Sequence, residues 1–171
     1  FKYADEKGVL LIHAAGNDAK DIDVEPNYPT SMYSFQTEPL DHFVTIGAST
    51  KNKGAEMVAS FSNYGAKGVD VFAPGSEIWS TVPENKYDYY SGTSMAAPSA
   101  AGVAAVLRSF FPKLKAHQVK KVLMNSGLPL YPTVENPDSG ELVNPKTLSK
   151  SGKMVNLYNA LIYASNKSYK K

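Results

Sequence analysis

The sequence predicts an α/β fold with a mostly parallel sheet, and three features support this prediction. Residues 9–15 and 44–49 are short apolar runs, the pattern of strands buried on both faces of a parallel sheet. Residues 96–111 are mostly small and apolar and almost free of charge, which predicts a helix buried on nearly every face. Residues 116–125 carry apolar side chains on one face and end near a glycine, which predicts an amphipathic helix.

The other elements are predicted in chain order. Residues 1–8 have the pattern of the end of an amphipathic helix stopped by Gly8, so we expect the chain to be a fragment. Residues 69–73 predict a third strand. Residues 78–82 and 87–90 predict a hairpin that leads into the small-residue helix, with Trp79 and the tyrosines as packing residues.

The last part of the chain predicts less regular structure. Residues 128–150 contain four prolines and little periodicity, so we expect a long surface excursion. A final helix is predicted at about residues 156–165, with Asn156 as its cap. Its core-facing residues are expected to be Leu157, Leu161 and Ile162.

Composition narrows the function classes only modestly. The 171 residues suffice for one domain with a sizeable core. A net charge of +2 is too small to indicate nucleic acid or an acidic membrane as a partner, and no apolar run is long enough to span a bilayer. The absence of cysteine excludes a disulfide framework, a zinc–thiolate site and a cysteine nucleophile.

Two hydroxyl groups, those of Thr93 and Ser94, stand where the small-residue helix begins. A helix N-terminus offers unpaired backbone N–H groups and the positive end of the helix dipole. A serine at that place can attack a carbonyl carbon while its own N–H stabilises the oxyanion. Pro98 cannot donate a hydrogen bond one turn back, so we expect an irregular first turn. The alternative is that Thr93 or Ser94 only caps a core helix.

The residues around Ser94 decide between these interpretations. Gly92-Thr93-Ser94-Met95-Ala96-Ala97-Pro98 resembles the nucleophile motif of the subtilisin-like serine proteases, the subtilases. Upstream, Ala14-Ala15-Gly16-Asn17 resembles the family's strand end, whose Asn completes the oxyanion hole. Four further blocks in the family's order follow: Asn27-Tyr28-Pro29, Val44-Thr45-Ile46-Gly47-Ala48, Ala59-Ser60-Phe61-Ser62-Asn63-Tyr64-Gly65 and Val71-Phe72-Ala73-Pro74-Gly75. The resemblance extends to about Gly127, and more loosely over residues 152–164.

The resemblance implies a subtilisin-like three-layer fold and a serine endopeptidase acting on peptide or protein substrates. Ser94 would be the nucleophile and Asn17 the second oxyanion donor. The implied substrate-binding residues are Ala14, Ala15 and Gly16 in one pocket wall, Tyr28, Pro29 and Thr30 in its floor, and Thr93 beside the nucleophile. Many members have Gly or Ala where this chain has Thr30, and His or Val where it has Ser99.

The rest of a catalytic triad is missing from the sequence. The family's D-[ST]-G and H-G-T-H-type motifs and its substrate-pairing S-L-G strand are absent, and His13, His42 and His117 lack the His-Gly context. We therefore expect residues 1–171 to be the C-terminal part of a single catalytic domain. Its N-terminal portion, carrying Asp and His, would lie upstream or on another chain, and the isolated chain would be inactive.

The sequence also leads to expectations about metal binding, cellular location and alternative functions. Asp18, Asp21, Asp23 and Glu25 are expected to form a solvated acidic loop, since their spacing is not that of an EF-hand. No cofactor is expected; subtilases often bind calcium, which the resemblance leaves open here, but no ligand set can be assigned from this sequence. Family resemblance implies a secreted or cell-envelope protein. The alternatives are a catalytically dead subtilase-like binding domain, an α/β-hydrolase, whose G-x-S-x-G elbow is absent, and a purely structural domain.

Overall fold

The computed structural model describes residues 1–33 and 35–167. Its centre is a five-stranded sheet in the order β1-β2-β3-β9-β6. The strands are β1 (Leu11–Ala14), β2 (Phe43–Ser49), β3 (Val71–Pro74), β9 (Lys153–Met154) and β6 (Leu128–Pro129). All neighbouring pairs are parallel except β6 with β9. The predicted α/β fold with a mostly parallel sheet is confirmed.

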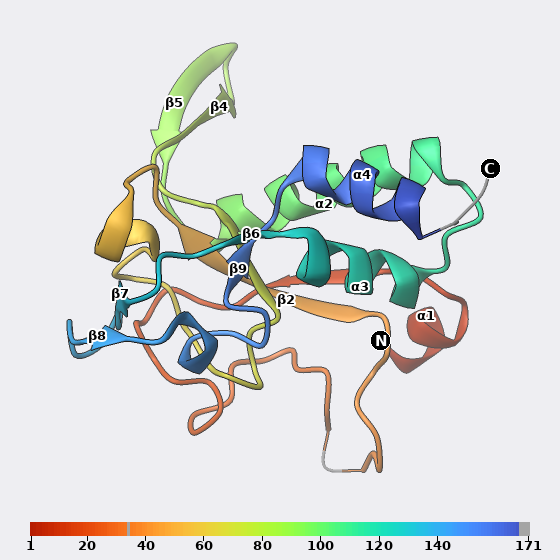
Figure 1. Cartoon of the computed structure of the whole chain (residues 1–171), viewed down its shortest axis with the longest axis horizontal. Helices are drawn as coiled ribbons and strands as arrows, with labels where there is room; N and C mark the ends of the chain where they lie inside the picture. The colour runs from red at the N-terminus through yellow and green to blue at the C-terminus, as the bar shows by residue number, and fades with distance from the viewer. Residues whose placement is uncertain (34, 168–171) are drawn as a thin grey trace.

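Three helices lie on one face of this sheet (Figure 1). They are α2 (Thr93–Phe110), which contacts β1, β2 and β3, and then α3 (Ala116–Ser126) and α4 (Leu157–Asn166), which pack against α2 and each other. The short helix α1 (Lys2–Glu6) precedes β1 and lies near the amino ends of β1 and β2, and Gly8 follows it with φ +72°. In Figure 1 the opposite face of the sheet carries loops.

Several small elements complete the fold. The predicted hairpin is present as β4 (Ile78–Val82) and β5 (Lys86–Tyr90), and it projects away from the body of the molecule in Figure 1. A second small pair is β7 (Val134–Glu135) with β8 (Leu142–Val143). Two 3₁₀ turns are η1 (Gly54–Met57) and η2 (Pro145–Thr147).

The burial of α2 differs from the prediction. The helix is buried along one face only, at Thr93, Ala96, Ala100, Ala104 and Leu107. Its other side, including Gly102 and Ala105, is exposed. The expectation of a helix buried on nearly every face was therefore wrong for the described residues, because the sheet covers only one side of it.

The first strand also differs from the prediction. Every residue of β2 is buried, whereas all four residues of β1 are only partly buried. The reason is that β1 forms the edge of the sheet and has β2 as its one neighbour there. An apolar run therefore identified the strand correctly, but this strand is not buried on both faces.

The end of the chain contributes more to the core than expected. Leu130, Val134 and Leu148 are buried with Phe72 in a second apolar cluster, so residues 128–150 are not merely a surface excursion. In α4 the buried residues are Ala160 and Ala164. The predicted core residues Leu157 and Ile162 are exposed, which corrects the prediction.

Two other sequence predictions for this region are confirmed. The core face of α3 consists of Val119, Val122 and Leu123, each at most 1% exposed. Asn156 caps α4, since its side-chain oxygen accepts a hydrogen bond from the Asn159 N–H at 2.8 Å.

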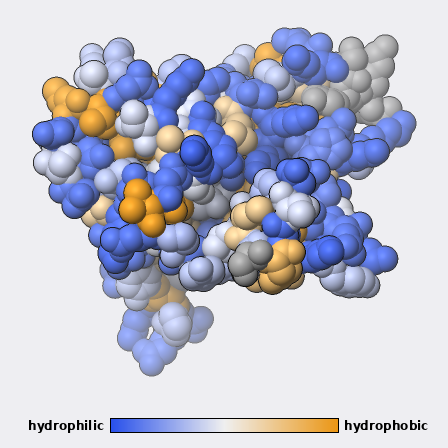
Figure 2. All heavy atoms as spheres, turned by 90° about the horizontal axis from the view of Figure 1, so that it is seen from below, coloured by the Kyte–Doolittle hydropathy of each residue, from blue (hydrophilic) through white to orange (hydrophobic). Residues whose placement is uncertain are grey.

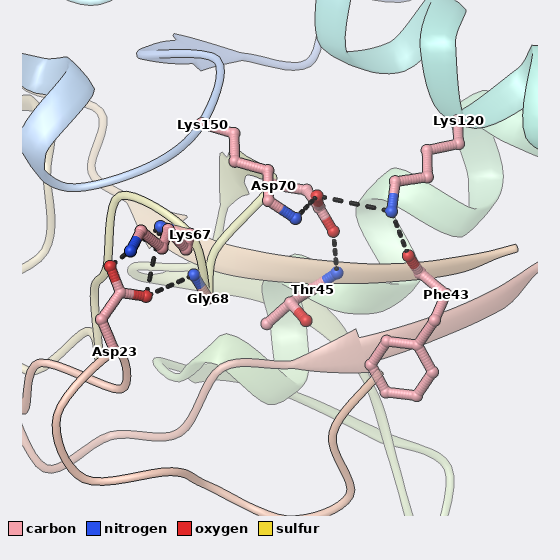
Figure 3. A network of polar contacts seen from close by, with 8 residues as sticks. All are labelled: Asp23, Phe43, Thr45, Lys67, Gly68, Asp70, Lys120 and Lys150. Carbon is pink, nitrogen blue, oxygen red and sulfur yellow. Dashed lines mark hydrogen bonds and ion pairs between the residues drawn. The ribbon is translucent and has the colours of Figure 1, made fainter. Parts of the chain in front are cut away.

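A buried carboxylate connects the sheet to the elements around it (Figure 3). Asp70, with its side chain 3% exposed, accepts hydrogen bonds from the Thr45 N–H at 2.9 Å and from the Lys150 ammonium at 2.8 Å. The ammonium of Lys120, from α3, lies 3.5 Å away and donates to the Phe43 carbonyl at 2.6 Å. Burial lowers the pKa of Lys120, and the Asp70 carboxylate opposes that shift.

One face of the molecule is mainly polar. The face seen in Figure 2 is mostly hydrophilic, with hydrophobic side chains in small separate patches. No helix within the described residues combines the length and apolar character needed to cross a lipid bilayer.

Candidate active site

The N-terminus of α2 lies beside the carboxyl ends of two parallel strands. β1 continues into Gly16-Asn17, and Asn17 is hydrogen-bonded to Thr93, the first residue of α2. β3 continues into Gly75, where an added Cβ would lie 3.0 Å from the Ala96 side chain of the same helix. In open α/β sheets, sites form at this edge.

Asn17 is held by two hydrogen bonds to one atom. Its Oδ1 accepts from the Thr93 backbone N–H at 2.8 Å and from the Thr93 hydroxyl at 2.9 Å. A backbone N–H can only donate, so the atom that faces it must be the amide oxygen. The Asn17 NH₂ group therefore points away from Thr93. The Thr93 hydroxyl in turn accepts from the Gly16 N–H at 3.1 Å.

Ser94 presents both of its relevant groups at the surface. Its side chain is exposed, and among the described residues no partner is found for its hydroxyl or its backbone N–H. The Thr93 N–H is taken up by Asn17 and the Met95 N–H by the Gly92 carbonyl. The Ser94 N–H is thus an unsatisfied donor of the first helical turn. Pro98 lies inside α2 and cannot donate to the Ser94 carbonyl.

Gly16 is required where β1 ends. Its φ is +102°, and an added Cβ would lie 2.3 Å from the Asn63 side-chain nitrogen. Asn63 is buried, and its amide NH₂ donates to the Ala15 carbonyl at 3.0 Å. Its oxygen accepts from the N–H groups of Asp18 and Lys20. Sequence reasoning missed this role of Asn63, because nothing local to a turn-rich segment signals a partner so far away in the chain.

The residues expected to form a substrate pocket are brought together only in part. Asn27 donates to the Ala15 carbonyl at 2.8 Å, which ties the segment Tyr28-Pro29 to the end of β1. Ala14 and Gly16 are partly exposed, but Ala15 is fully buried, so its side chain does not reach the surface in this structure.

The predicted pocket floor lines a cavity of about 480 Å³. Tyr28, Pro29 and Thr30 line it together with His13 and Thr45 of the neighbouring strands, and Ser94 is not among its lining residues. Tyr28 itself is 70% exposed. The Thr30 hydroxyl donates to the Met32 carbonyl at 2.7 Å, so it closes its own turn.

The three histidines are engaged elsewhere. His13 lies on β1 with its ring 5.5 Å from that of Phe43, and burial lowers its pKa below the ordinary value of 6.5. His42 and His117 stack with ring centroids 6.0 Å apart, and the His42 Nδ1 lies 2.8 Å from the Asp5 carbonyl oxygen. Within residues 1–33 and 35–167, no contact joins any of them to Ser94.

Comparison with known proteins identifies the family. The family model described as "Subtilase family" matches residues 1–153. The chain belongs to the subtilase family.

Relatives and solved structures agree with this membership. The chain is 35% identical over 144 residues to subtilisin-like protease 2 of Plasmodium falciparum, covering 81% of this chain and 10% of that protein. It is 39% identical over 133 residues to the cell wall-associated protease of Bacillus subtilis, covering 78% of this chain and 13% of that protein. It superposes on the prenylagaramide maturation protease PagA with a TM-score of 0.67 and 27% identity, over 95% of this chain and 53% of that one. The chain thus spans a minor part of these two relatives and about half of PagA.

Two carboxylates of the acidic loop of this subtilase chain are engaged by other groups of the same chain. Asp23 accepts hydrogen bonds from the backbone N–H groups of Lys67 and Gly68 (Figure 3), and Glu25 pairs with Lys20 at 2.8 Å. In the described part of the chain, no three or more His, Asp or Glu side chains gather in a way that could hold a metal ion.

The hairpin of the subtilase chain is fixed at its base, next to Ser94. The Gly92 N–H donates to the Gly75 carbonyl at 2.7 Å, and the Glu77 N–H donates to the Ser91 hydroxyl at 2.8 Å. Beyond this base the side chain of Trp79 is 55% exposed. The expectation that Trp79 and the tyrosines of the hairpin are packing residues is therefore wrong as regards the core, because the hairpin extends into solvent.

Proposed function

We propose that this chain carries the nucleophile and the oxyanion-stabilising groups of a subtilisin-like serine endopeptidase. The observation that carries the proposal is the pair of hydrogen bonds from Thr93 to the Asn17 Oδ1, at 2.8 and 2.9 Å. They turn the Asn17 NH₂ group outward beside the first turn of α2, where Ser94 is exposed. The Asn17 NH₂ and the Ser94 N–H would then both donate to the carbonyl oxygen of a bound substrate.

The proposed reaction is acyl transfer to Ser94. The Ser94 Oγ attacks the carbonyl carbon of a peptide bond, and the oxygen becomes an oxyanion held by the Asn17 NH₂ and the Ser94 N–H. The serine proton passes to a base and from there to the leaving amine as the C–N bond breaks. Water then attacks the ester in a second step of the same kind, which releases the acid and restores Ser94.

The base is proposed to come from outside residues 1–171. In the described residues the three histidines contact groups other than Ser94, and burial favours the neutral form of His13 at a place away from the helix. We propose an N-terminal portion of the same domain that carries Asp and His. The isolated chain should then be inactive, since no base among its described residues contacts Ser94 to remove the proton.

Two features support a covering segment of this kind. The edge strand β1 has backbone groups available for another strand. A groove of about 470 Å³ lies between the β1 side and the exposed side of α2, lined mainly by small and apolar residues such as Leu10, Ile12, Ala101 and Ala105. Apolar side chains on an otherwise polar surface favour a partner that buries them.

The proposed substrate is an extended polypeptide. The residue before the cleaved bond would lie against Ala14 and Gly16, with Tyr28, Pro29 and Thr30 beyond them. The bond from Asn27 to the Ala15 carbonyl supports this arrangement, since it holds the two segments together. An extracellular or cell-envelope location is proposed as well, supported by the cell wall-associated relative from Bacillus subtilis.

Labelling with a fluorophosphonate, read by intact and peptide mass spectrometry, tests the function. In the longest natural polypeptide that contains this chain we expect one adduct, on Ser94. It should be lost in Ser94→Ala and kept in Ser99→Ala, a second serine five residues further along α2. The isolated chain should stay unlabelled. An unlabelled complete protein would overturn the proposal and favour a catalytically dead binding domain instead.

A further inference from the structure

An exposed group of aromatic rings lies on one face of the β4–β5 hairpin. Trp79 pairs directly with Tyr89 across the two strands, and Thr81 pairs with Tyr87. The Trp79 ring lies 4.6 Å from that of Tyr89 and 5.9 Å from that of Tyr87, centroid to centroid. We call Trp79, Tyr87 and Tyr89 the aromatic face.

The hairpin's own stability does not account for this face. Cross-strand aromatic pairs do stabilise a two-stranded hairpin, which is marginal by itself. Yet Trp79, Tyr87 and Tyr89 remain 55%, 60% and 61% exposed after making these contacts. Large amphipathic rings that keep more than half of their surface in water are typical of recognition surfaces.

The aromatic face carries no charge of its own. Ionisable acidic and basic residues of the hairpin lie on the other face or at the turn, where Lys86 pairs with Glu84 at 2.8 Å. Between the three rings stands only Thr81, which is also exposed. Such a face suits neutral apolar, aromatic or proline side chains.

The position of the hairpin fixes which part of a substrate it can meet. Asn17 lies on the β1 side of Ser94, together with the proposed pocket for the residue before the cleaved bond. The chain enters the hairpin from β3, which lies two strands away from β1 in the sheet. After the hairpin it passes through Ser91 and Gly92 directly to Ser94. A substrate whose residue before the cleaved bond lies against Ala14 and Gly16, and which then passes Ser94, therefore leaves toward the hairpin.

We propose that the aromatic face binds the substrate segment that follows the cleaved bond and selects apolar or aromatic side chains there. This inference rests on the proposed function. Tyr89 lies five positions before Ser94, and since β5 ends at Tyr90 and α2 begins at Thr93, about 17 Å at about 3.3 Å per residue is an upper limit on their separation. The substrate residues that reach it therefore lie no further than about the fifth position after the cleaved bond, and the fourth and fifth positions are the ones tested. Trp79, at the centre of the face, is the main specificity-determining residue of this subsite.

Comparing the cleavage of three substrates distinguishes binding at this subsite from the catalytic step. All share the same residues before the cleaved bond. The first ends in a chromogenic amine, the second continues for six residues with Phe at the fourth and fifth positions, and the third has Ser at those positions. The enzyme is the complete natural polypeptide, compared with its Trp79→Ala variant. Ser80→Ala is the matched control, because Ser80 is exposed on the opposite face of the same strand.

We expect the unmodified protein to prefer the Phe substrate over the Ser substrate by about tenfold in kcat/KM, the scale of an aromatic contact. Trp79→Ala should remove that preference and leave cleavage of the chromogenic substrate within about twofold. Trp79→Phe should keep most of the preference, and Ser80→Ala all of it.

The contrary results are distinct. Equal preference in Trp79→Ala and the unmodified protein overturns the subsite and leaves the proposed function intact. Failure of the unmodified protein to cleave any of the three substrates overturns the proposed function and the subsite with it. A dimer that Trp79→Ala dissociates, seen by size-exclusion chromatography with light scattering, would assign the aromatic face to a second copy and overturn the subsite as well.

Discussion

Thr93 directs two hydrogen bonds to a single oxygen atom of Asn17. The Oδ1 of Asn17 accepts from the backbone N–H at 2.8 Å and from the hydroxyl at 2.9 Å. The hydroxyl also accepts from the Gly16 N–H, so one threonine fixes the end of β1 and the orientation of the amide that follows it. Preorganisation of this kind lets a donor act on a developing charge without first being rearranged.

Thr93→Val should therefore reduce turnover without weakening substrate binding. The variant keeps the shape of the side chain and the backbone bond but loses the hydroxyl's donor and acceptor contacts. We expect kcat to fall by about tenfold, the value of roughly one hydrogen bond, with KM nearly unchanged. Thr93→Ser should restore most of the loss. A Val variant as active as the unmodified protein would contradict the proposed role.

Asn17→Ala should cost more than the loss of Thr93. It removes the donor itself, and we expect kcat to fall by about a hundred- to a thousandfold. That magnitude is the one known for subtilisin, a member of this family, and is carried over. Steady-state kinetics of the complete protein give the measurement, with Asn52→Ala, at another exposed Asn, as the control. A loss mainly in KM would argue for ground-state binding instead.

Asp70→Asn should destabilise the fold. The carboxylate is the counter-charge of two ammonium groups, Lys150 at 2.8 Å and the largely buried Lys120 at 3.5 Å. Removing one partner of a buried pair costs about 3–5 kcal/mol in free energy of unfolding, measured by urea denaturation. Lys86→Ala removes an exposed pair and should cause no measurable change. Equal stability of both variants would count against the network.

His13 should make stability depend on pH in the mildly acid range. Burial lowers its pKa below 6.5 in the folded state, so the unfolded chain binds the proton first as pH falls. The free energy of unfolding should decrease as pH falls from 6.5 toward the folded pKa and then become independent of this group. His13→Gln should show a shallower dependence in the same denaturation series. An unchanged slope in that variant would refute the assignment.

The sequence predicted the parallel strands and the hairpin because their signals are local. Apolar runs bounded by breakers identify β2 and β3 wherever they lie in the sheet. It did not reveal that β1 is an edge strand, because neighbours in a sheet come from distant parts of the chain. The same reason explains the burial of Leu130, Val134 and Leu148, whose partner Phe72 lies in β3.

The candidate site likewise has features that the sequence predicted and features that it did not. The motifs around Ser94 and Asn17 were readable because each is a short run of particular residues. The contacts that orient them were not, since Thr93 and Asn17 are 76 residues apart and Asn63 acts on Ala15 across 48. Polar side chains that bind distant backbone leave no periodic trace in the sequence.

The bond between the Gly92 N–H and the Gly75 carbonyl has a consequence for how such a protein can diversify. It closes the chain at the foot of the hairpin, so the segment between the two glycines is joined there to the strand end that packs against α2. Length and sequence can change in this segment while the serine stays in place. The hairpin is thus an exchangeable segment, and grafting another hairpin between Gly75 and Gly92 offers a way to change the proposed subsite while Ser94 and Asn17 stay in place.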